Sequence, residues 1–353
     1  MEKTENQKIN IDEDKKKKKS EEKNMRDPGI GIDVGTGNLV VAESLNQEAS
    51  FKLQRDAFLD IEDNKMSRNM LDKLKANYIQ SDNELFIIGE EALQVANFFN
   101  KDARRPLSHG CISTREKNAL SMIKVILKNL LGDPVKENET CYFSVPAAPI
   151  DQENFNVVYH ENILKTFISS FGFSAQAINE AFAIIWSELE DENYTGMAIS
   201  FGAGMTNVCL SFMGTSEKEH QFSFARGGDF IDSSSAEAVG LKASRITVIK
   251  EAGVDLLNPK TREETAIKIY YDNLIKYVCD GMETKFNNSS TIPNFPEPIV
   301  VILSGGTAKA INFEKVFETE IKKKNLPFKI KSVQKAKDQL NSVAQGCLLN
   351  ALG

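Results

Sequence analysis

Residues 31–38 read Gly-Ile-Asp-Val-Gly-Thr-Gly-Asn, and apolar runs flank them at 29–32 and 39–42. This pattern predicts a strand, a tight turn and a second strand. The glycines allow positive φ angles and let backbone N–H groups approach a ligand closely. Asp33 comes just before the turn, where its carboxylate can hold a hydrated cation. The stretch therefore predicts a β-hairpin whose turn binds phosphate.

A weaker copy of this pattern occurs about half a chain later. Residues 199–207 read Ile-Ser-Phe-Gly-Ala-Gly-Met-Thr-Asn, again between short apolar runs at 196–198 and 208–210. Two hairpins with glycine turns predict two related domains that grip one phosphate chain between them. The copies differ at one position that matters for chemistry, because Ser200 stands where the first hairpin has Asp33.

The composition is that of a water-soluble globular protein with room for two medium-sized domains. The chain has 353 residues, of which 41% are hydrophobic and 26% charged. Its net charge of −7 argues against general nucleic-acid binding. No apolar run reaches the length of a bilayer span, and the N-terminus lacks the apolar core of a signal peptide. The five cysteines are scattered singly, as expected for reduced thiols, so we expect a cytoplasmic protein without a zinc site.

The first 27 residues form a charged segment with almost no apolar side chains, and we expect it to be disordered. Acidic residues flank the run Lys15 to Lys19, so the tail is nearly charge-balanced. A solvated tail is the simple interpretation. The alternative is an electrostatic contact of Lys15 to Lys19 with an anionic membrane or an adaptor protein.

Strand and helix patterns alternate along the first half of the chain. Residues 51–100 suggest a small mixed subdomain, and Arg104 and Arg105 after it are expected in structural or surface roles, with anion binding as the alternative. Apolar spacing predicts helices over 116–131 and 154–171 and a strand over 173–178, after which Glu180 begins a further helix. This alternation indicates an α/β fold with mixed sheets.

The second half continues the alternation. We expect a strand over 221–225, a helix beginning at 231–232, and helices over 245–251 and 263–287. The apolar strand 299–303 enters a glycine turn at a helix start, which is a good anion or nucleotide site. The last helix carries Gly346, where close packing against another helix would suit a glycine.

Eight short motifs follow one another in an order that is hard to attribute to chance. Besides the two turns they are Val-Pro-Ala at 145–147, Asn-Glu-Ala at 179–181, Gly-Gly-x-x-x-Asp at 227–232, Ile-Lys-Glu at 249–251, Ser-Gly-Gly-Thr at 304–307 and Val-Ala-x-Gly at 343–346. Together they resemble the actin superfamily of ATPases over residues 29–353. Gly-Glu-Glu-Ala at 89–92 and Arg-Pro-Leu-x-x-Gly at 105–110 look most like the MreB and MamK type of bacterial or archaeal actin.

This resemblance implies the actin/DnaK-type ATPase fold, with two related domains around a central nucleotide cleft. The first would comprise 28–182 plus 338–353, with the small subdomain inserted at about 51–100, and the second 183–337. The ligands would be ATP or ADP with Mg²⁺. Asp33 would hold Mg²⁺ through water, and Glu180 would orient the attacking water. The nucleotide itself would contact Gly35, Thr36, Gly37, Asn38, Gly202, Ala203, Gly204, Met205, Gly227, Gly228, Asp232, Lys250, Glu251, Ser304, Gly305, Gly306 and Thr307.

Each of these roles has a plainer alternative. Asp33 can be a turn residue, and Glu180 a helix N-terminal charge that the macrodipole favours. Lys250 and Glu251 can be a solvated pair, and 304–307 a simple turn. Ser200 departs from the Asp-x-Gly-x-Gly-x-Thr pattern of the family and adds no negative charge near the metal. We therefore expect Mg²⁺ dependence to be weaker or shifted toward higher Mg²⁺ than in relatives with Asp.

Three functions are compatible with the sequence. The first is a cytoskeletal protein that assembles head to tail with itself when ATP is bound and hydrolyses ATP slowly, acting in cell shape, organelle positioning or DNA segregation. The second is a small-molecule kinase of the same superfamily, although no second acidic group is placed like a substrate carboxylate. The third is a nucleotide-binding scaffold that does not polymerise, which Ser200 makes credible. None of them involves direct contact with nucleic acid.

Overall fold

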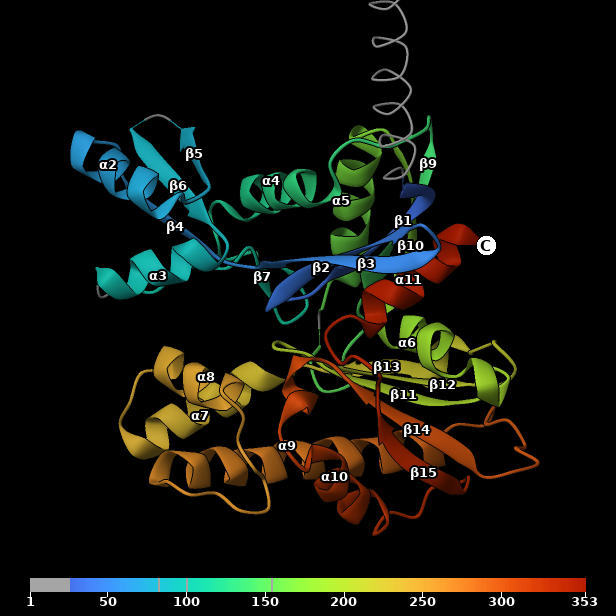
Figure 1. Ribbon diagram of the computed structural model, residues 1–353. Helices are drawn as coiled ribbons and strands as arrows, with labels where there is room; N and C mark the ends of the chain where they lie inside the picture. Colours follow the sequence, from blue (N-terminus) through green and yellow to red (C-terminus); the bar gives the residue numbers. More distant parts are fainter. Residues whose placement is uncertain (1–25, 82, 100, 154) are drawn as a thin grey trace, which may run out of the picture.

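The computed structural model describes residues 26–81, 83–99, 101–153 and 155–353 (Figure 1). The predicted contact through Lys15 to Lys19, and the disorder expected for 1–25, lie outside these residues. The boundary at 27 was wrong, because strand β1 already begins at Arg26. The buried Glu139 explains this, since it accepts hydrogen bonds from the Arg26 guanidinium (2.9 Å from Nη2) and from the Gly29 N–H group (2.9 Å).

A five-stranded mixed sheet forms the core of the first half. Its order is β10-β9-β1-β2-β3, with β1, β2 and β3 antiparallel and β9 and β10 parallel to β1. The predicted first hairpin is the β1–β2 pair, in which Asp33 lies opposite Val40. The strands are β1 (Arg26–Val34), β2 (Asn38–Leu45), β3 (Glu48–Arg55), β9 (Glu139–Val145) and β10 (Phe173–Asn179).

A second five-stranded sheet repeats this plan. Its order is β13-β12-β11-β14-β15, again three antiparallel strands followed by two parallel ones. The predicted second hairpin is the β11–β12 pair, in which Ser200 lies opposite Asn207. The repeat explains why the glycine-turn pattern occurs twice in the sequence. The strands are β11 (Gly196–Phe201), β12 (Thr206–Ser211), β13 (Gln221–Phe224), β14 (Ile299–Ser304) and β15 (Ile330–Lys335).

The small subdomain has its own three-stranded sheet, in the order β4-β6-β5, and its own apolar core around Leu71 and Ile87. It begins at Phe58 and not near 51, because all eight residues of β3 pair with β2 in the first sheet. Its elements are β4 (Phe58–Glu62), α2 (Lys65–Leu74), β5 (Tyr78–Ser81), β6 (Glu84–Ile88) and α3 (Glu90–Phe98), and the short pair β7 (Leu107–Ser108) and β8 (Cys111–Ile112) follows.

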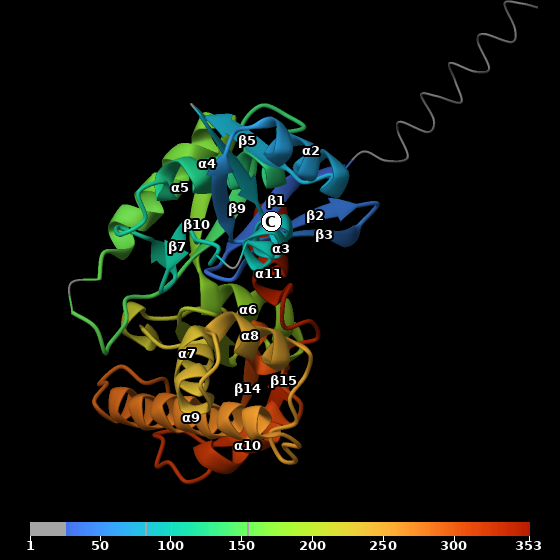
Figure 2. The same ribbon diagram turned by 90° about the vertical axis from the view of Figure 1, so that its left-hand side faces the viewer.

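Helices cover the outer faces of both sheets. Apolar residues of α4 (Ala119–Leu131) and α5 (Val157–Ser170) join the core of the first sheet, and α9 (Arg262–Asn287) and α10 (Phe313–Ile321) join that of the second. Helix α7 (Gly228–Val239) begins earlier than predicted, so Asp232 lies within it, and α8 (Ala243–Glu251) follows. Figure 2 shows the small subdomain above α7 and α8 on the same side of the molecule. No helix among the described residues combines the length and hydropathy that a bilayer span requires.

Two helices, α6 (Glu180–Glu188) and α11 (Ser342–Leu352), lie between the two sheets (Figure 1). They pack very closely, as the sequence predicted for Gly346: a Cβ atom there would come within 1.8 Å of the Ala183 carbonyl oxygen. Gly31 allows the same closeness between β1 and α11, since its Cβ would meet the Leu348 nitrogen at 2.2 Å. This packing places the first residue of α6, Glu180, near both glycine turns.

Candidate functional site

One cavity of about 480 Å³ gathers most of the predicted site residues. It lies between the two sheets and has both glycine turns in its wall. The predicted residues that line it are Asp33, Gly35, Thr36, Gly37, Asn38, Glu180, Gly202, Ala203, Gly204, Met205, Asp232, Lys250, Glu251, Gly305, Gly306 and Thr307. Gly227, Gly228 and Ser304 do not line it. They stand behind the wall, where the Gly228 N–H group donates to the Gly202 carbonyl at 2.9 Å.

The two turns are closed by equivalent backbone hydrogen bonds. In the first, the Gly35 N–H group donates to the Asn38 carbonyl at 3.1 Å; in the second, the Gly202 N–H group donates to the Met205 carbonyl at 2.9 Å. The turns also approach one another, because a Cβ on Gly37 would lie 3.1 Å from the Ala203 Cβ. Residues of both turns line the same cavity, and glycine turns of this kind suit a chain of phosphates.

Asp33 is held by a neighbour that the sequence analysis did not single out. The Ser144 hydroxyl donates to Asp33 Oδ1 at 2.8 Å and accepts from the Val34 N–H group at 2.9 Å. Desolvation raises the pKa of Asp33 to about 6, and the hydrogen bond from Ser144 partly offsets this. Ser144 sits at the end of β9, next to β1, so its role follows from strand pairing that the sequence does not display.

Glu180 is the first residue of α6, whose N-cap Asn179 accepts from the Phe182 N–H group at 3.0 Å. Both of its carboxylate oxygens are hydrogen-bonded to the second hairpin. The Ser200 hydroxyl donates to Oε1 at 2.6 Å, and the Asn207 amide donates to Oε2 at 2.9 Å. Desolvation and the charge of Asp33 raise the pKa of Glu180 to about 8, while the hydrogen bond from Ser200 lowers it. Asn207 is therefore a site residue that the sequence analysis missed.

The opposite end of the cavity is built by α7, α8 and the turn after β14. Lys250 forms an ion pair with Asp232 at 2.7 Å and donates to the Gly228 carbonyl at 3.0 Å. Desolvation raises the pKa of Asp232, and the charge of Lys250 partly offsets this. Thr247 donates to the other Asp232 oxygen at 2.8 Å. Lys250 is thus largely buried and forms part of the cavity wall through its ion pair with Asp232. The plainer interpretation, in which Lys250 is a solvated surface residue, was wrong.

The Ser304–Thr307 segment forms a glycine turn after β14, as predicted. Gly305 has a φ of 88°, and the helix that follows is the short 3₁₀ helix η3 (Gly306–Lys309). The Thr307 hydroxyl donates to the Gly202 carbonyl at 2.9 Å, which ties this turn to the second glycine turn. Ser304 is buried beneath, where its hydroxyl donates to the Gln339 carbonyl at 3.1 Å.

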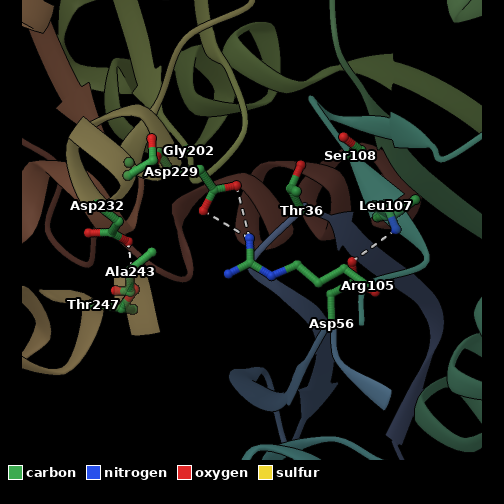
Figure 3. A network of polar contacts seen from close by, with 12 residues as sticks. Thr36, Asp56, Arg105, Leu107, Ser108, Gly202, Asp229, Asp232, Ala243 and Thr247 are labelled. Carbon is green, nitrogen blue, oxygen red and sulfur yellow. Dashed lines mark hydrogen bonds and ion pairs between the residues drawn. The ribbon is translucent and has the colours of Figure 1, made fainter. Parts of the chain in front are cut away.

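Ion pairs join the two sides of the cavity. Arg105 Nη1 lies 2.9 Å from both carboxylate oxygens of Asp229, at the start of α7 (Figure 3). Arg55 at the end of β3 holds Glu251 of α8 through two bonds of 2.9 and 2.7 Å. Both arginines line the cavity. The structural role expected for Arg105 is therefore a contact between the two halves of the chain. Glu251 is likewise paired with the Arg55 guanidinium.

Arg104, the other member of the arginine pair, forms ion pairs with Asp60 and Glu116, which both belong to the first half of the chain. Its guanidinium lies 4.6 Å from the centre of the Phe58 ring and 3.3 Å from Glu116.

Beneath Arg105, the fully buried Asp56 accepts from the Leu107 N–H group at 3.2 Å (Figure 3). Desolvation raises the pKa of Asp56, and the charge of Arg105 opposes this.

The donor set fits a nucleotide with its Mg²⁺ better than a metal ion alone. Among the described residues no group of three or more His, Cys, Asp or Glu side chains could hold a metal ion. Mg²⁺ commonly keeps several waters and binds through one or two carboxylates together with substrate phosphates. Asp33 beside the first turn supplies such a carboxylate, and the turns supply N–H groups for the phosphates.

Comparisons with known proteins give the fold. The family described as Volactin matches residues 29–351 of the chain. The MamK double helical filament superposes with a TM-score of 0.71 at 16% identity, over 92% of this chain and 98% of that one. MreB5 of Spiroplasma citri bound to ADP gives 0.62 at 18% identity, over 90% and 94%. The ethanolamine utilization protein EutJ from Carboxydothermus hydrogenoformans gives 0.53 at 14% identity, over 92% and 90%. No protein with curated annotation matches the sequence. The predicted actin-like fold is thereby confirmed.

Proposed function

The chain belongs to the Volactin family, and from this premise we propose that it binds ATP with Mg²⁺ between two actin-like halves and hydrolyses it slowly. The observation that carries the proposal is the pair of glycine turns, closed by equivalent hydrogen bonds, in the wall of one cavity with Asp33 and Glu180 beside them. Structures of similar fold support it, since MreB5 of Spiroplasma citri is bound to ADP and a MamK variant to AMPPNP.

The residues divide the work in a way that suits phosphoryl transfer. That reaction depends on positioning and charge stabilisation more than on a strong base. Backbone N–H groups of the two turns would hold the phosphates, and Asp33 would hold the Mg²⁺ through water. The metal ion would neutralise the charge that develops on the phosphate oxygens. Glu180 would orient the attacking water, and its attachment to the second hairpin fixes its carboxylate for this purpose.

We also propose that the ATP-bound protein assembles head to tail into filaments in the cytoplasm. The MamK structure of similar fold is a double helical filament. A repeating, non-closing contact between copies produces an open polymer. Nucleotide would hold the two sides of the cavity together, along with the ion pairs Arg55–Glu251 and Arg105–Asp229. Hydrolysis of the nucleotide would loosen the filaments. Cell shape, organelle positioning and DNA segregation are the processes in which such a filament would act.

Sedimentation and phosphate release, measured on the same samples with ATP and Mg²⁺, test the proposal. We expect ATP-dependent pelleting together with slow phosphate release, and tight binding of a fluorescent ATP analogue. Phosphate transfer only in the presence of an added small-molecule acceptor would instead identify a kinase. Failure of the analogue to bind would overturn the proposal as a whole.

A non-polymerising scaffold is the second candidate, and Ser200 is the observation that favours it. With serine at this position the second hairpin brings no carboxylate of its own beside the first turn. Nucleotide binding without pelleting and without phosphate release would support this alternative over the filament.

A further inference from the structure

The second hairpin presents two hydrogen-bond donors to one carboxylate. Ser200 and Asn207 lie directly opposite each other on β11 and β12, so their side chains leave the sheet on the same face. Each is only 1% exposed. Ser200 donates to one oxygen of Glu180 and Asn207 to the other, at 2.6 and 2.9 Å. The two donors therefore fix both the place and the rotation of the carboxylate.

The orientation of the Asn207 amide is itself determined. Its Oδ1 accepts from the Ala147 N–H group at 3.0 Å, which leaves the NH₂ group facing Glu180. A glutamate side chain loses rotamer freedom when it is ordered, at a cost that good partners must offset. The pair of donors offsets this cost before any nucleotide arrives. The carboxylate is thus pre-oriented on a rigid strand pair.

We propose that Ser200 and Asn207 are positioning residues that hold the Glu180 carboxylate toward the phosphate end of the cavity. This inference rests on the proposed ATP hydrolysis, and it gives position 200 a function other than metal binding. Each carboxylate oxygen has two lone-pair sites, so Glu180 can accept from an attacking water while both donors remain bound. The Ser200 hydroxyl donates its proton to Glu180. Because Ser200 and Asn207 are both uncharged, they place no further negative charge beside the Glu180 carboxylate.

Four variants and a control test the inference, and the fourth variant is the conservative Ser200→Thr. Ser200→Ala and Asn207→Ala each remove one donor, and the double variant removes both. The matched control is Ser211→Ala on β12, because Ser211 is equally buried but donates to the Tyr194 carbonyl at 2.8 Å, away from the cavity. Phosphate release, affinity for a fluorescent ATP analogue and thermal unfolding are measured for all of them.

We expect each single variant to lower the maximal rate of phosphate release roughly tenfold or more, because small losses of alignment reduce rates strongly. The nucleotide affinity should change less than about twofold, since neither side chain belongs to the turns. The double variant should be little slower than the worse single variant, because the donors act on one group. Ser200→Thr, which retains the hydroxyl and suits a strand, should recover most of the rate.

The outcomes separate this inference from the proposed function. A wild-type protein that binds ATP but releases no phosphate would overturn the hydrolysis that we propose. A wild-type protein that hydrolyses ATP, with Ser200→Ala and Asn207→Ala equally fast, would overturn the positioning role alone. The positioning role would also be overturned if Ser211→Ala lost as much rate as Ser200→Ala and Asn207→Ala. The same holds if the Ser200 and Asn207 variants differed from the wild type only in weaker nucleotide binding. If Asn207→Ala unfolds, Ser200→Ala carries the test, because it leaves the backbone pairing intact.

Discussion

The β1–β2 hairpin and the β11–β12 hairpin share a backbone and differ in chemistry. Both close with a bond from the first glycine of the turn to the carbonyl three residues on, at 3.1 and 2.9 Å. Counted from the turn, Asp33 and Val40 of the first hairpin occupy the places of Ser200 and Asn207 in the second. One hairpin therefore offers a carboxylate, and the other offers two donors that hold a carboxylate from α6. A duplicated backbone can thus retain its turn while its flanking side chains take different partners.

The strand beside each hairpin shows the same divergence. Ser144 on β9 and Ser304 on β14 occupy equivalent places in the two sheets. Ser144 donates to Asp33 at 2.8 Å, whereas Ser304 bonds away from the turn to the Gln339 carbonyl at 3.1 Å. Only the first of these serines thus supports a carboxylate of its own hairpin. The difference supports the first hairpin as the side that would hold the proposed Mg²⁺.

Asp33→Asn should have the largest effect on this comparison. The amide retains the size of the side chain but removes the negative charge that would hold the hydrated Mg²⁺. We expect phosphate release to fall roughly 100-fold, as when a preorganised electrostatic group is removed from an active site. Phosphate release over a Mg²⁺ titration measures it. An unchanged rate at every Mg²⁺ concentration would show that the first hairpin is not the metal side.

Ser200→Asp makes the second hairpin resemble the first, and it separates two roles for this position. The new carboxylate would lie against Glu180, where the hydroxyl is now 2.6 Å away. Two carboxylates so close disfavour each other's ionisation. We expect phosphate release at neutral pH to fall roughly tenfold, which corresponds to a loss of about 1.4 kcal/mol. Faster release that needs less Mg²⁺ would instead show that position 200 belongs to the metal side.

Gly204→Ala and Gly37→Ala compare the third residue of the two turns. A Cβ on Gly204 would meet the Thr36 Oγ1 at 2.7 Å and the His109 backbone at 2.9 Å, while a Cβ on Gly37 would meet only the Ala203 Cβ, at 3.1 Å. We expect Gly204→Ala to lower the free energy of unfolding by about 1–3 kcal/mol, the usual cost of overpacking, and Gly37→Ala by less. Urea unfolding without nucleotide measures both. Equal losses would contradict the asymmetry of the two turns.

Glu180→Gln should also change the pH dependence of stability in the nucleotide-free protein. Desolvation raises the pKa of Glu180 from 4.5 to about 8, so between these values the folded protein binds more protons than the unfolded chain. Its contribution to the free energy of unfolding therefore falls as the pH rises from 4.5 to 8. Glutamine removes this loss, so the variant should gain a few kcal/mol (~1.4 kcal/mol per pKa unit) over the wild type at pH 8, and no such gain is expected near pH 4.5.

Urea unfolding of the nucleotide-free protein over this pH range measures the effect of Glu180→Gln. Glu237→Gln is a suitable control, because Glu237 is exposed on α7, away from the cavity. A constant difference between the Glu180 variant and the wild type would show that the second hairpin holds a carboxylate of ordinary acidity.

The sequence alone was enough to predict both hairpins, most of the long helices and the residues of both turns. These predictions succeed because glycine turns between apolar strands, and apolar residues at helical spacing, are local patterns. The same local patterns placed Glu180 at a helix start and Gly346 at a close helix contact. The end of the charged tail and the start of the small subdomain were misjudged, because the first depends on Glu139, more than a hundred residues away, and the second on the pairing of β3 with β2.

Only the tertiary structure decided what the second hairpin does. In the sequence Ser200 is a missing carboxylate, and Asn207 is an ordinary strand residue. Their common partner, Glu180, precedes both of them in the sequence and belongs to α6. The same holds for Ser144 at Asp33 and for Arg105 at Asp229, which are 111 and 124 residues apart. A glycine turn is a property of a few neighbouring residues, whereas a hydrogen bond between distant segments exists only once packing has brought them together.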